Sequence, residues 1–211
     1  MSKALVVQFQ PRKTPRQARS AASVEAILEA TIQVLRKDGK SKLTTTRIAD
    51  RAGVSVGTLY QYFPNKSSLL QALLKDHLDR VALAVETACE AAHGASLASM
   101  AETITSAFVQ AKFRNIDASV ALYAVSDDIE GKRIARGMHA RSLKAMTTLF
   151  GTARDTPFAE PDIVAATLLS AMAGVSRAML EKGVTRTTMA TMERELTTMV
   201  RAYLQASAKD G

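Results

Sequence analysis

Apolar residues recur every three or four positions along almost the whole chain, and no stretch alternates between apolar and polar residues with a period of two. A spacing of three and four places apolar side chains on one face of an α-helix. We therefore expect helices over residues 15–37, 44–52, 55–63, 65–92, 97–113, 116–125, 128–150, 162–182 and 187–206. The pattern predicts an all-α fold of about nine helices.

Start and stop signals support these limits. Thr14, Pro15 and Gln17 are typical of a capped helix start. Gly39 follows the first helix and suits the left-handed conformation that ends many helices. Gly53 separates the next two short helices. The first third of the chain is therefore predicted to be a compact unit of three helices.

The distribution of charge also distinguishes the first third of the chain from the rest. The chain has 28 Lys and Arg and 20 Asp and Glu, a formal net charge of +8. Residues 1–66 contain that entire excess, whereas residues 67–211 sum to zero. A basic N-terminal third on a neutral remainder favours a polyanionic partner that is held by the basic part.

Residues 44–63 read TTTRIADRAGVSVGTLYQYF. Two short helices joined by a tight turn, with Ile48, Leu59 and Phe63 available for a shared core, indicate a helix-turn-helix. In this motif the second helix enters the major groove of DNA and presents its N-terminal turn to the bases. That turn holds small residues that allow a close approach of the backbone: Ser55, Val56, Gly57 and Thr58.

Two tyrosines and a lysine follow. Tyr60 and Tyr62 are two positions apart, so they cannot both join Phe63 in the core. At least one phenol should face outward, where its hydroxyl can donate to a phosphate. Lys66 stands at the start of the next helix, whose free backbone N–H groups also favour an anion.

This segment resembles the DNA-binding signature of the tetracycline-repressor (TetR) family, in the string IAxxAGVSxGTLYxYFxxKxxL from Ile48 to Leu69. The resemblance covers about residues 20–70. It implies a three-helix DNA-binding head, a helical ligand-binding and dimerisation body, and repression of transcription. It also implies roles by position: Thr45 and Thr46 at the backbone and a base, Val56, Gly57 and Thr58 in the groove, and Tyr60, Tyr62 and Lys66 at phosphates.

We divide the chain into a flexible basic arm at 1–14, a helix-turn-helix domain at 15–66 and a ligand-binding and dimerisation domain at 67–211. The bases near the arm either follow the phosphates or minor groove, or belong to a solvated tail. The sequence departs from the family pattern after Lys66, where Ser67 and Ser68 replace the usual acidic residue. This departure leaves the cap of the fourth helix open.

The body is rich in methionine: apart from Met1, all eight lie between positions 100 and 199. Methionine fills ordinary cores and also lines adaptable apolar cavities. The family resemblance favours a cavity for a small, largely apolar effector. Its candidate lining residues are Phe108, Phe113, Tyr123, Met138 and Met172.

The last predicted helix carries a seam with spacings of three and four that is typical of helix-to-helix packing between chains. The helix before it is apolar on more than one side, so we expect a homodimer that forms a four-helix bundle. The alternative is a monomeric bundle that buries both faces internally. The candidate interface residues are Leu169, Met192, Leu196, Met199 and Tyr203.

Other classes of function find little support. No Cys or His pair has metal-ligand spacing, no catalytic motif is present, and no cofactor is implied. Uninterrupted apolar runs are short, so no membrane span is expected. The single Cys89 and the lack of a secretory signal favour the cytoplasm, with nucleoid association when DNA is bound.

The leading hypothesis is a ligand-responsive repressor that binds a palindromic double-stranded operator as a dimer and is released by a small effector. The alternative is a non-specific architectural nucleic-acid-binding protein.

Overall fold

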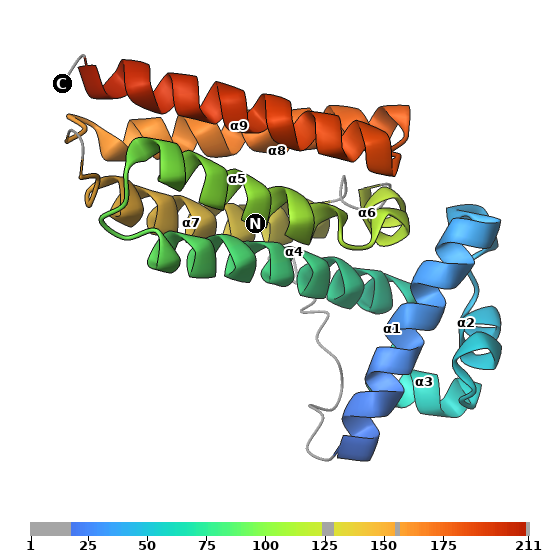
Figure 1. Cartoon of the computed structure of the whole chain (residues 1–211). Coiled ribbons are helices and arrows are strands. Elements are labelled where there is room, and N and C mark those ends of the chain that lie inside the picture. The colour runs from blue at the N-terminus through green and yellow to red at the C-terminus, as the bar shows by residue number, and fades with distance from the viewer. Residues whose placement is uncertain (1–17, 124–128, 155–156, 210–211) are drawn as a thin grey trace, which may run out of the picture.

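The computed structural model describes residues 18–123, 129–154 and 157–209. Within these ranges the chain is helical and contains no strand, which confirms the all-α prediction (Figure 1). The helices are α1 (Ala18–Asp38), the 3-10 turn η1 (Lys40–Lys42), α2 (Thr45–Ala52), α3 (Val56–Tyr62), α4 (Lys66–Ala91), α5 (Leu97–Phe113), α6 (Ile116–Tyr123), α7 (Ile129–Phe150), α8 (Pro161–Lys182) and α9 (Arg186–Lys209). The predicted arm at 1–14 lies outside the described residues.

The local signals act as capping groups in the head. Thr44 caps α2, where its hydroxyl accepts a hydrogen bond from the Arg47 amide at 3.3 Å. Gly53 ends α2 with a φ of 67°, a left-handed conformation that glycine adopts without strain. The cap of α4, which the sequence left open, is formed by side chains. Asn65 and Ser68 form a reciprocal capping box, so the serine takes the position where an acidic residue is usual.

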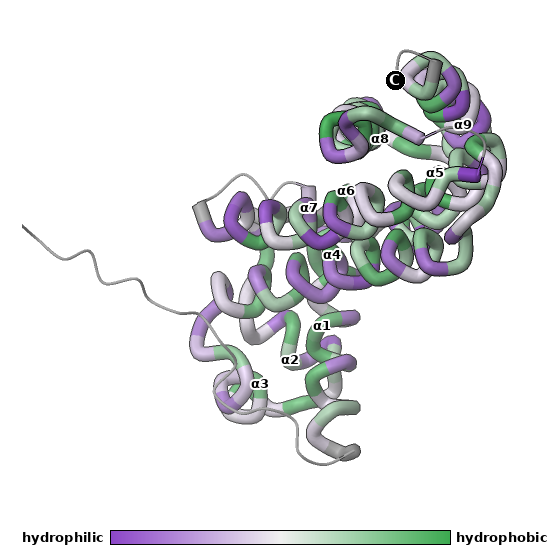
Figure 2. The backbone as a smooth tube through the Cα atoms, turned by 90° about the vertical axis from the view of Figure 1, so that its left-hand side faces the viewer, coloured by the Kyte–Doolittle hydropathy of each residue, from purple (hydrophilic) through white to green (hydrophobic). Residues whose placement is uncertain are grey.

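The molecule has a small head at one end of a layered body (Figure 1). Helices α1, α2 and α3 form the head, and α4 extends from it along the full length of the body. In the body α4 packs against α5 and α7, α5 packs against α9, and α7 packs against α8. Figure 2 shows α8 and α9 on the side of the body far from the head.

Two hydrophobic cores share α4. Its first turns, from Leu69 to Leu78, are buried in the head core together with Ala118 and Leu122 of α6. From Val81 onward the same helix is buried in the body core. The head core therefore extends beyond position 66, and the two cores meet inside α4.

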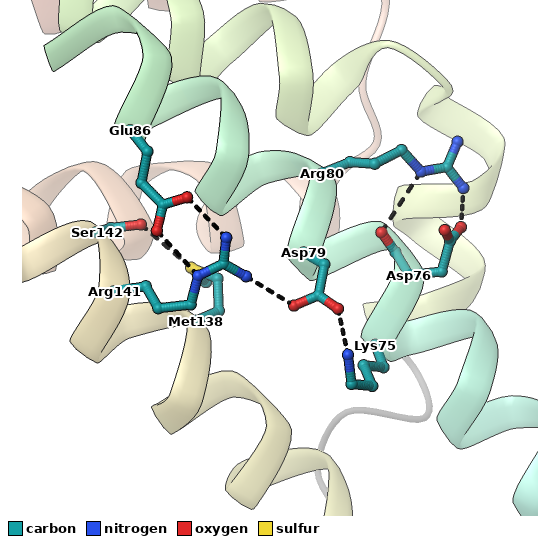
Figure 3. A network of polar contacts seen from close by, with 8 residues as sticks. All are labelled: Lys75, Asp76, Asp79, Arg80, Glu86, Met138, Arg141 and Ser142. Atoms are coloured by element: carbon teal, nitrogen blue, oxygen red, sulfur yellow. Dashed lines mark hydrogen bonds and ion pairs between the residues drawn. The ribbon is translucent and has the colours of Figure 1, made fainter. Parts of the chain in front are cut away.

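Polar contacts fix α7 against α4 (Figure 3). The Arg141 guanidinium of α7 binds both carboxylate oxygens of Glu86, at 2.9 and 2.7 Å, and an oxygen of Asp79 at 3.0 Å. Lys75 pairs with the other Asp79 oxygen. These groups are partly exposed to solvent, so each pair contributes little energy. The bidentate geometry instead sets the register between the two helices.

Helix α8 is long and apolar, and it is only partly buried. It has the length and the mean hydropathy, 1.7, of a membrane span, with 39% of that window buried. Uninterrupted apolar runs do not reveal this candidate. Ser and Thr residues break the runs in α8 without adding charge. Ile163 and Val175 are 51% and 37% exposed on this helix.

His77 lies at the junction of the two cores. It is on α4 between Leu73 of the head core and Val81 of the body core, four residues from each. Burial and, as the smaller cause, repulsion from the Lys112 ammonium together lower the pKa of the His77 imidazole to about 4. The imidazole is therefore neutral at physiological pH.

The depressed pKa of His77 predicts a pH-dependent stability. In the unfolded chain the imidazole titrates near its ordinary pKa of about 6.5, so the unfolded state takes up the proton first as the pH falls. The contribution of neutral His77 is complete above that pH and is lost as the pH falls towards 4. Between pH 7 and pH 5 the loss is about 2 kcal/mol. Urea unfolding at both pH values should show a smaller loss for His77→Gln than for the wild type, and equal losses would contradict this assignment.

Candidate nucleic-acid interface

The first turn of α3 is open to the outside. Ser55 and Gly57 are exposed, and Val56 and Thr58 are partly exposed. Gly57 has no positive φ, and a Cβ built there would meet only the Ser55 Oγ, at an ordinary 3.7 Å. Nothing within the described chain therefore requires glycine at this position. Its missing side chain leaves room for a molecule outside the protein.

Hydrogen bonds hold this turn in place. The Ser55 Oγ accepts from the Thr58 backbone amide at 3.0 Å and lies 2.8 Å from the Thr58 Oγ1. The cap thus satisfies a free amide at the start of α3 and orients both hydroxyls. The turn predicted to face the groove therefore presents hydroxyls, one small apolar side chain and bare backbone, held by these hydrogen bonds.

A second contact joins the start of α2 to α3. The Thr45 Oγ1 lies 3.2 Å from the Tyr60 hydroxyl, and the Tyr60 residue is 41% exposed. Two predicted phosphate contacts, 15 positions apart, therefore meet on one exposed surface. Thr46 is exposed beside them.

Tyr62 differs from Tyr60 in its surroundings. Its residue is only 9% exposed, and its hydroxyl lies 2.8 Å from the Ser20 Oγ of α1. Residues two apart on a helix point in nearly opposite directions, so Tyr60 faces outward and Tyr62 faces the head core. Its hydroxyl is hydrogen-bonded within the head, which favours a structural role for Tyr62 over the predicted phosphate contact. It ties α1 to α3. Ser20, its partner, was missed because a contact over 42 positions leaves no local sequence signal.

The helix starts in the head favour anions. The first turns of α2, α3 and α4 contain no acidic residue. Lys66 is exposed at the first residue of α4, next to the backbone amides of that turn. Two other head bases have partners inside the protein: Arg47 pairs with Asp38 at 3.2 Å, and Arg51 donates to Gln33 at 2.6 Å. Lys66 therefore contributes to an anion-attracting surface.

The predicted ligand-lining residues do not line one common space. Phe108, Phe113 and Met172 are buried in the body core. Met138 packs against the head core instead. The Tyr123 hydroxyl donates to Glu181, and its ring lies 5.1 Å from the Arg177 guanidinium carbon, so this residue links α6 to α8.

The predicted dimer-interface residues do not all lie on one surface. Met192, Leu196 and Met199 line an open apolar groove of about 430 Å³ between α8 and α9, together with Val175 and Met179. Tyr203 is half-buried against the body core. Leu169 is 2% exposed inside the body and, unlike the similarly buried Leu196, does not line this groove, so its assignment to an intermolecular interface is wrong. The helical period around α8 puts Leu169 on the inner face and Val175 on the outer one.

Metal binding finds no support in the described part of the chain, where no cluster of three or more His, Cys, Asp or Glu is placed to hold an ion. The lone Cys89 is buried, and burial raises the pKa of its thiol to about 12.

Comparison with known proteins agrees with this geometry. A family model for bacterial regulatory proteins of the tetR family matches residues 27–73. A model for the tetracyclin repressor-like C-terminal domain matches residues 96–204. The chain therefore belongs to the TetR family of DNA-binding transcriptional regulators, which are not enzymes.

Individual relatives match mainly in the head. The chain is 44% identical over 55 residues to the HTH-type transcriptional repressor KstR of Mycobacterium tuberculosis, which is 26% of this chain and 25% of KstR. It is 45% identical over 51 residues to the regulator YvkB of Bacillus subtilis, 24% of this chain and 27% of YvkB. These alignments span about a quarter of each relative.

Solved structures match over nearly the whole chain. A transcriptional regulator from Rhodococcus sp. Rha1 superposes with a TM-score of 0.66 at 19% identity, covering 88% of this chain and 98% of that one. The fatty acid degradation regulator FadR from Bacillus halodurans gives 0.63 at 18% identity, covering 84% and 97%. At this identity the likeness concerns the fold.

The contrast between the tyrosines predicts opposite outcomes for the same substitution. Tyr60→Phe should weaken DNA binding, because it removes an exposed hydroxyl, and should leave the free energy of unfolding nearly unchanged. Tyr62→Phe should lower that free energy by about 1 kcal/mol, because it breaks the bond to Ser20. Denaturant unfolding and DNA titration of both variants check this, and a larger DNA defect in Tyr62→Phe would overturn the assignment.

Proposed function

We propose that this protein is a homodimeric, ligand-responsive repressor that binds a palindromic DNA operator and is released by a small-molecule effector. The observation that carries the proposal is the first turn of α3, where Gly57 leaves bare backbone on an exposed surface without any internal need for glycine. A bare, rigid helix start is what a recognition helix needs to reach base edges in the major groove.

We assign the contacts in two groups. Thr46, Val56, Gly57 and Thr58 face the bases, where the methyl groups of Val and Thr suit a thymine methyl. Thr45, Ser55, Tyr60 and Lys66 hold phosphates, which set the register of the protein on the duplex. The net charge of +8 in the first third adds affinity without selecting a sequence.

The groove between α8 and α9 supports the dimer. Its walls are mostly apolar, with Thr188, Thr191 and Glu195 among the lining residues, and α8 is only 39% buried over its most apolar window. A second copy that packs its own α8 and α9 against this face would cover the apolar lining residues Val175, Met179, Met192, Leu196 and Met199. Two heads at a fixed separation then match two half-sites.

Ligand response follows from the shared helix. Because α4 belongs to both cores, a ligand that favours another position of α4 in the body changes the separation of the heads. A coupling free energy of roughly 1–3 kcal/mol would weaken operator binding about 5- to 150-fold. The name of KstR, a repressor, supports repression as the direction of control. The site of action is the cytoplasm, on the nucleoid when DNA is bound.

The alternative is a non-specific architectural protein that uses the same basic head. Both functions predict binding that weakens with salt. They differ in specificity, because a repressor should prefer its operator over random duplex by roughly 10³-fold or more at physiological salt.

Selection of genomic fragments with the purified protein tests the proposed function. We expect the bound fragments to share an inverted repeat, because a two-fold dimer presents two identical recognition helices. Random competitor DNA should not displace them. Bound fragments without any symmetric consensus would favour the architectural alternative.

Val175→Glu tests the dimer. Val175 is 37% exposed in the monomer, so a charge there should spare the fold and disrupt the interface. Leu83→Glu is the matched control, because Leu83 is 58% exposed on α4, away from this groove. Sedimentation should give a monomer for Val175→Glu and a dimer for the wild type and Leu83→Glu. A Val175→Glu protein with the wild-type mass would exclude this face as the interface.

A further inference from the structure

Two basic residues lie on helices that pack against each other, near the point where the two cores meet. His77 belongs to α4, and Lys112 belongs to the last turn of α5. Lys112 is close enough to His77 for their charges to repel, which contributes to the low pKa of His77. Both side chains are largely enclosed, although each residue keeps some access to solvent.

These groups lack partners within the described chain. The Nε2 of His77 is buried there without a hydrogen-bond partner. Burial lowers the pKa of Lys112, and no carboxylate among the described residues offsets this effect. The Thr105 hydroxyl, two turns before Lys112 on the same face of α5, is also buried there without a partner.

Such an arrangement is unfavourable for folding alone. Enclosing a cation without a counter-ion is destabilising, and a buried polar atom without a hydrogen-bond partner adds to the cost. A hydrophobic residue at position 112 would avoid this cost. The pair is therefore best explained by a negatively charged group that is not part of the chain.

We propose that His77 and Lys112 form the polar end of the effector site and bind the carboxylate of an amphipathic organic acid. This inference rests on the proposed ligand response and names its chemistry. One carboxylate oxygen pairs with the Lys112 Nζ, and the other accepts a hydrogen bond from the His77 Nε2–H. The apolar part of the acid lies along α5 beside Ile104 and Phe108, among the methionines of the body core.

The position of the site explains how its occupation reaches the head. His77 is four residues from Leu73 in the head core and four from Val81 in the body core. A carboxylate bound between α4 and α5 at this point acts on a helix that contributes buried residues to both cores. Its effect on α4 is transmitted directly to α1, α2 and α3, because the first turns of α4 complete their core.

Binding of simple probes to the full-length protein tests the charge preference. Octanoate and decanoate should raise the melting temperature and shift the His77 ring resonances in NMR spectra. The matched alcohols and the matched alkylammonium ions should do neither at the same concentration. Equal stabilisation by the alcohols, or stronger stabilisation by the ammonium ions, would overturn the proposal.

Variants of Lys112 test the site. Lys112→Met should weaken octanoate binding at least tenfold, whereas Lys112→Arg keeps the charge and should retain binding. Lys144→Met, an exposed lysine on α7, is the matched control and should behave as the wild type. Undiminished binding by Lys112→Met would exclude Lys112 from the site.

The ligand-free protein gives an independent readout. Lys112→Met should raise its melting temperature, because an uncompensated charge is removed. A lower melting temperature would show that the ammonium has a stabilising partner of its own and would overturn the proposal.

Measuring which compounds release the operator distinguishes failure of the carboxylate site from failure of the proposed function. If neutral compounds release the operator and carboxylates do not, the carboxylate site is wrong and ligand-responsive repression stands. If operator binding is specific and neither carboxylates nor neutral or cationic compounds of a broad metabolite panel alter it, both ligand response and the carboxylate site are wrong.

Discussion

Apolar burial along α4 is the constraint on which the rest of the structure depends. A helix of 26 residues runs about 40 Å, far enough to leave one core and enter another. Its first turns close the core of the small head, which has too few residues to bury its apolar surface alone. Its later turns are a central element of the body. The orientation of the DNA-binding surface is therefore fixed by packing in the body, and Arg141 fixes the register of that packing.

The head separates affinity from selectivity. The basic charge of the first third attracts a polyanion at long range, whereas the residues at the start of α3 are small and neutral. Some head bases, such as Arg47 and Arg51, are already engaged within the protein. In our account the hydroxyls and bare backbone near Gly57 read the groove, and the spacing of two heads adds the remaining selectivity. In the same account the neutral body carries the face that packs against a second copy and encloses the effector site.

Local features of this fold were predictable from the sequence, and long-range features were not. The helix limits, the cap at Ser55 and the turn at Gly53 follow from neighbours within a few positions. The sequence did not show which of the two tyrosines faces outward, because this depends on the contact of Tyr62 with α1. The predicted domain boundary at residue 66 did not show that α4 contributes to both cores. The apolar stripe of α4 is continuous, so it does not reveal where the helix passes from the head core to the body core. The meeting of His77 and Lys112 likewise has no sequence signal, because it depends on how α4 and α5 pack.

The distance between the two heads of the dimer tests the central role of α4 most directly. Because Cys89 is buried and the pKa of its thiol is raised, a single cysteine introduced at the exposed Lys37 of α1 can be spin-labelled selectively. Pulsed electron spin resonance then measures the separation between labels in the homodimer. We predict one narrow distance in the free protein, and a second, displaced narrow distance when a ligand that releases the operator is bound. A broad distribution in both states would contradict the account, because it would show that the heads move independently of the body.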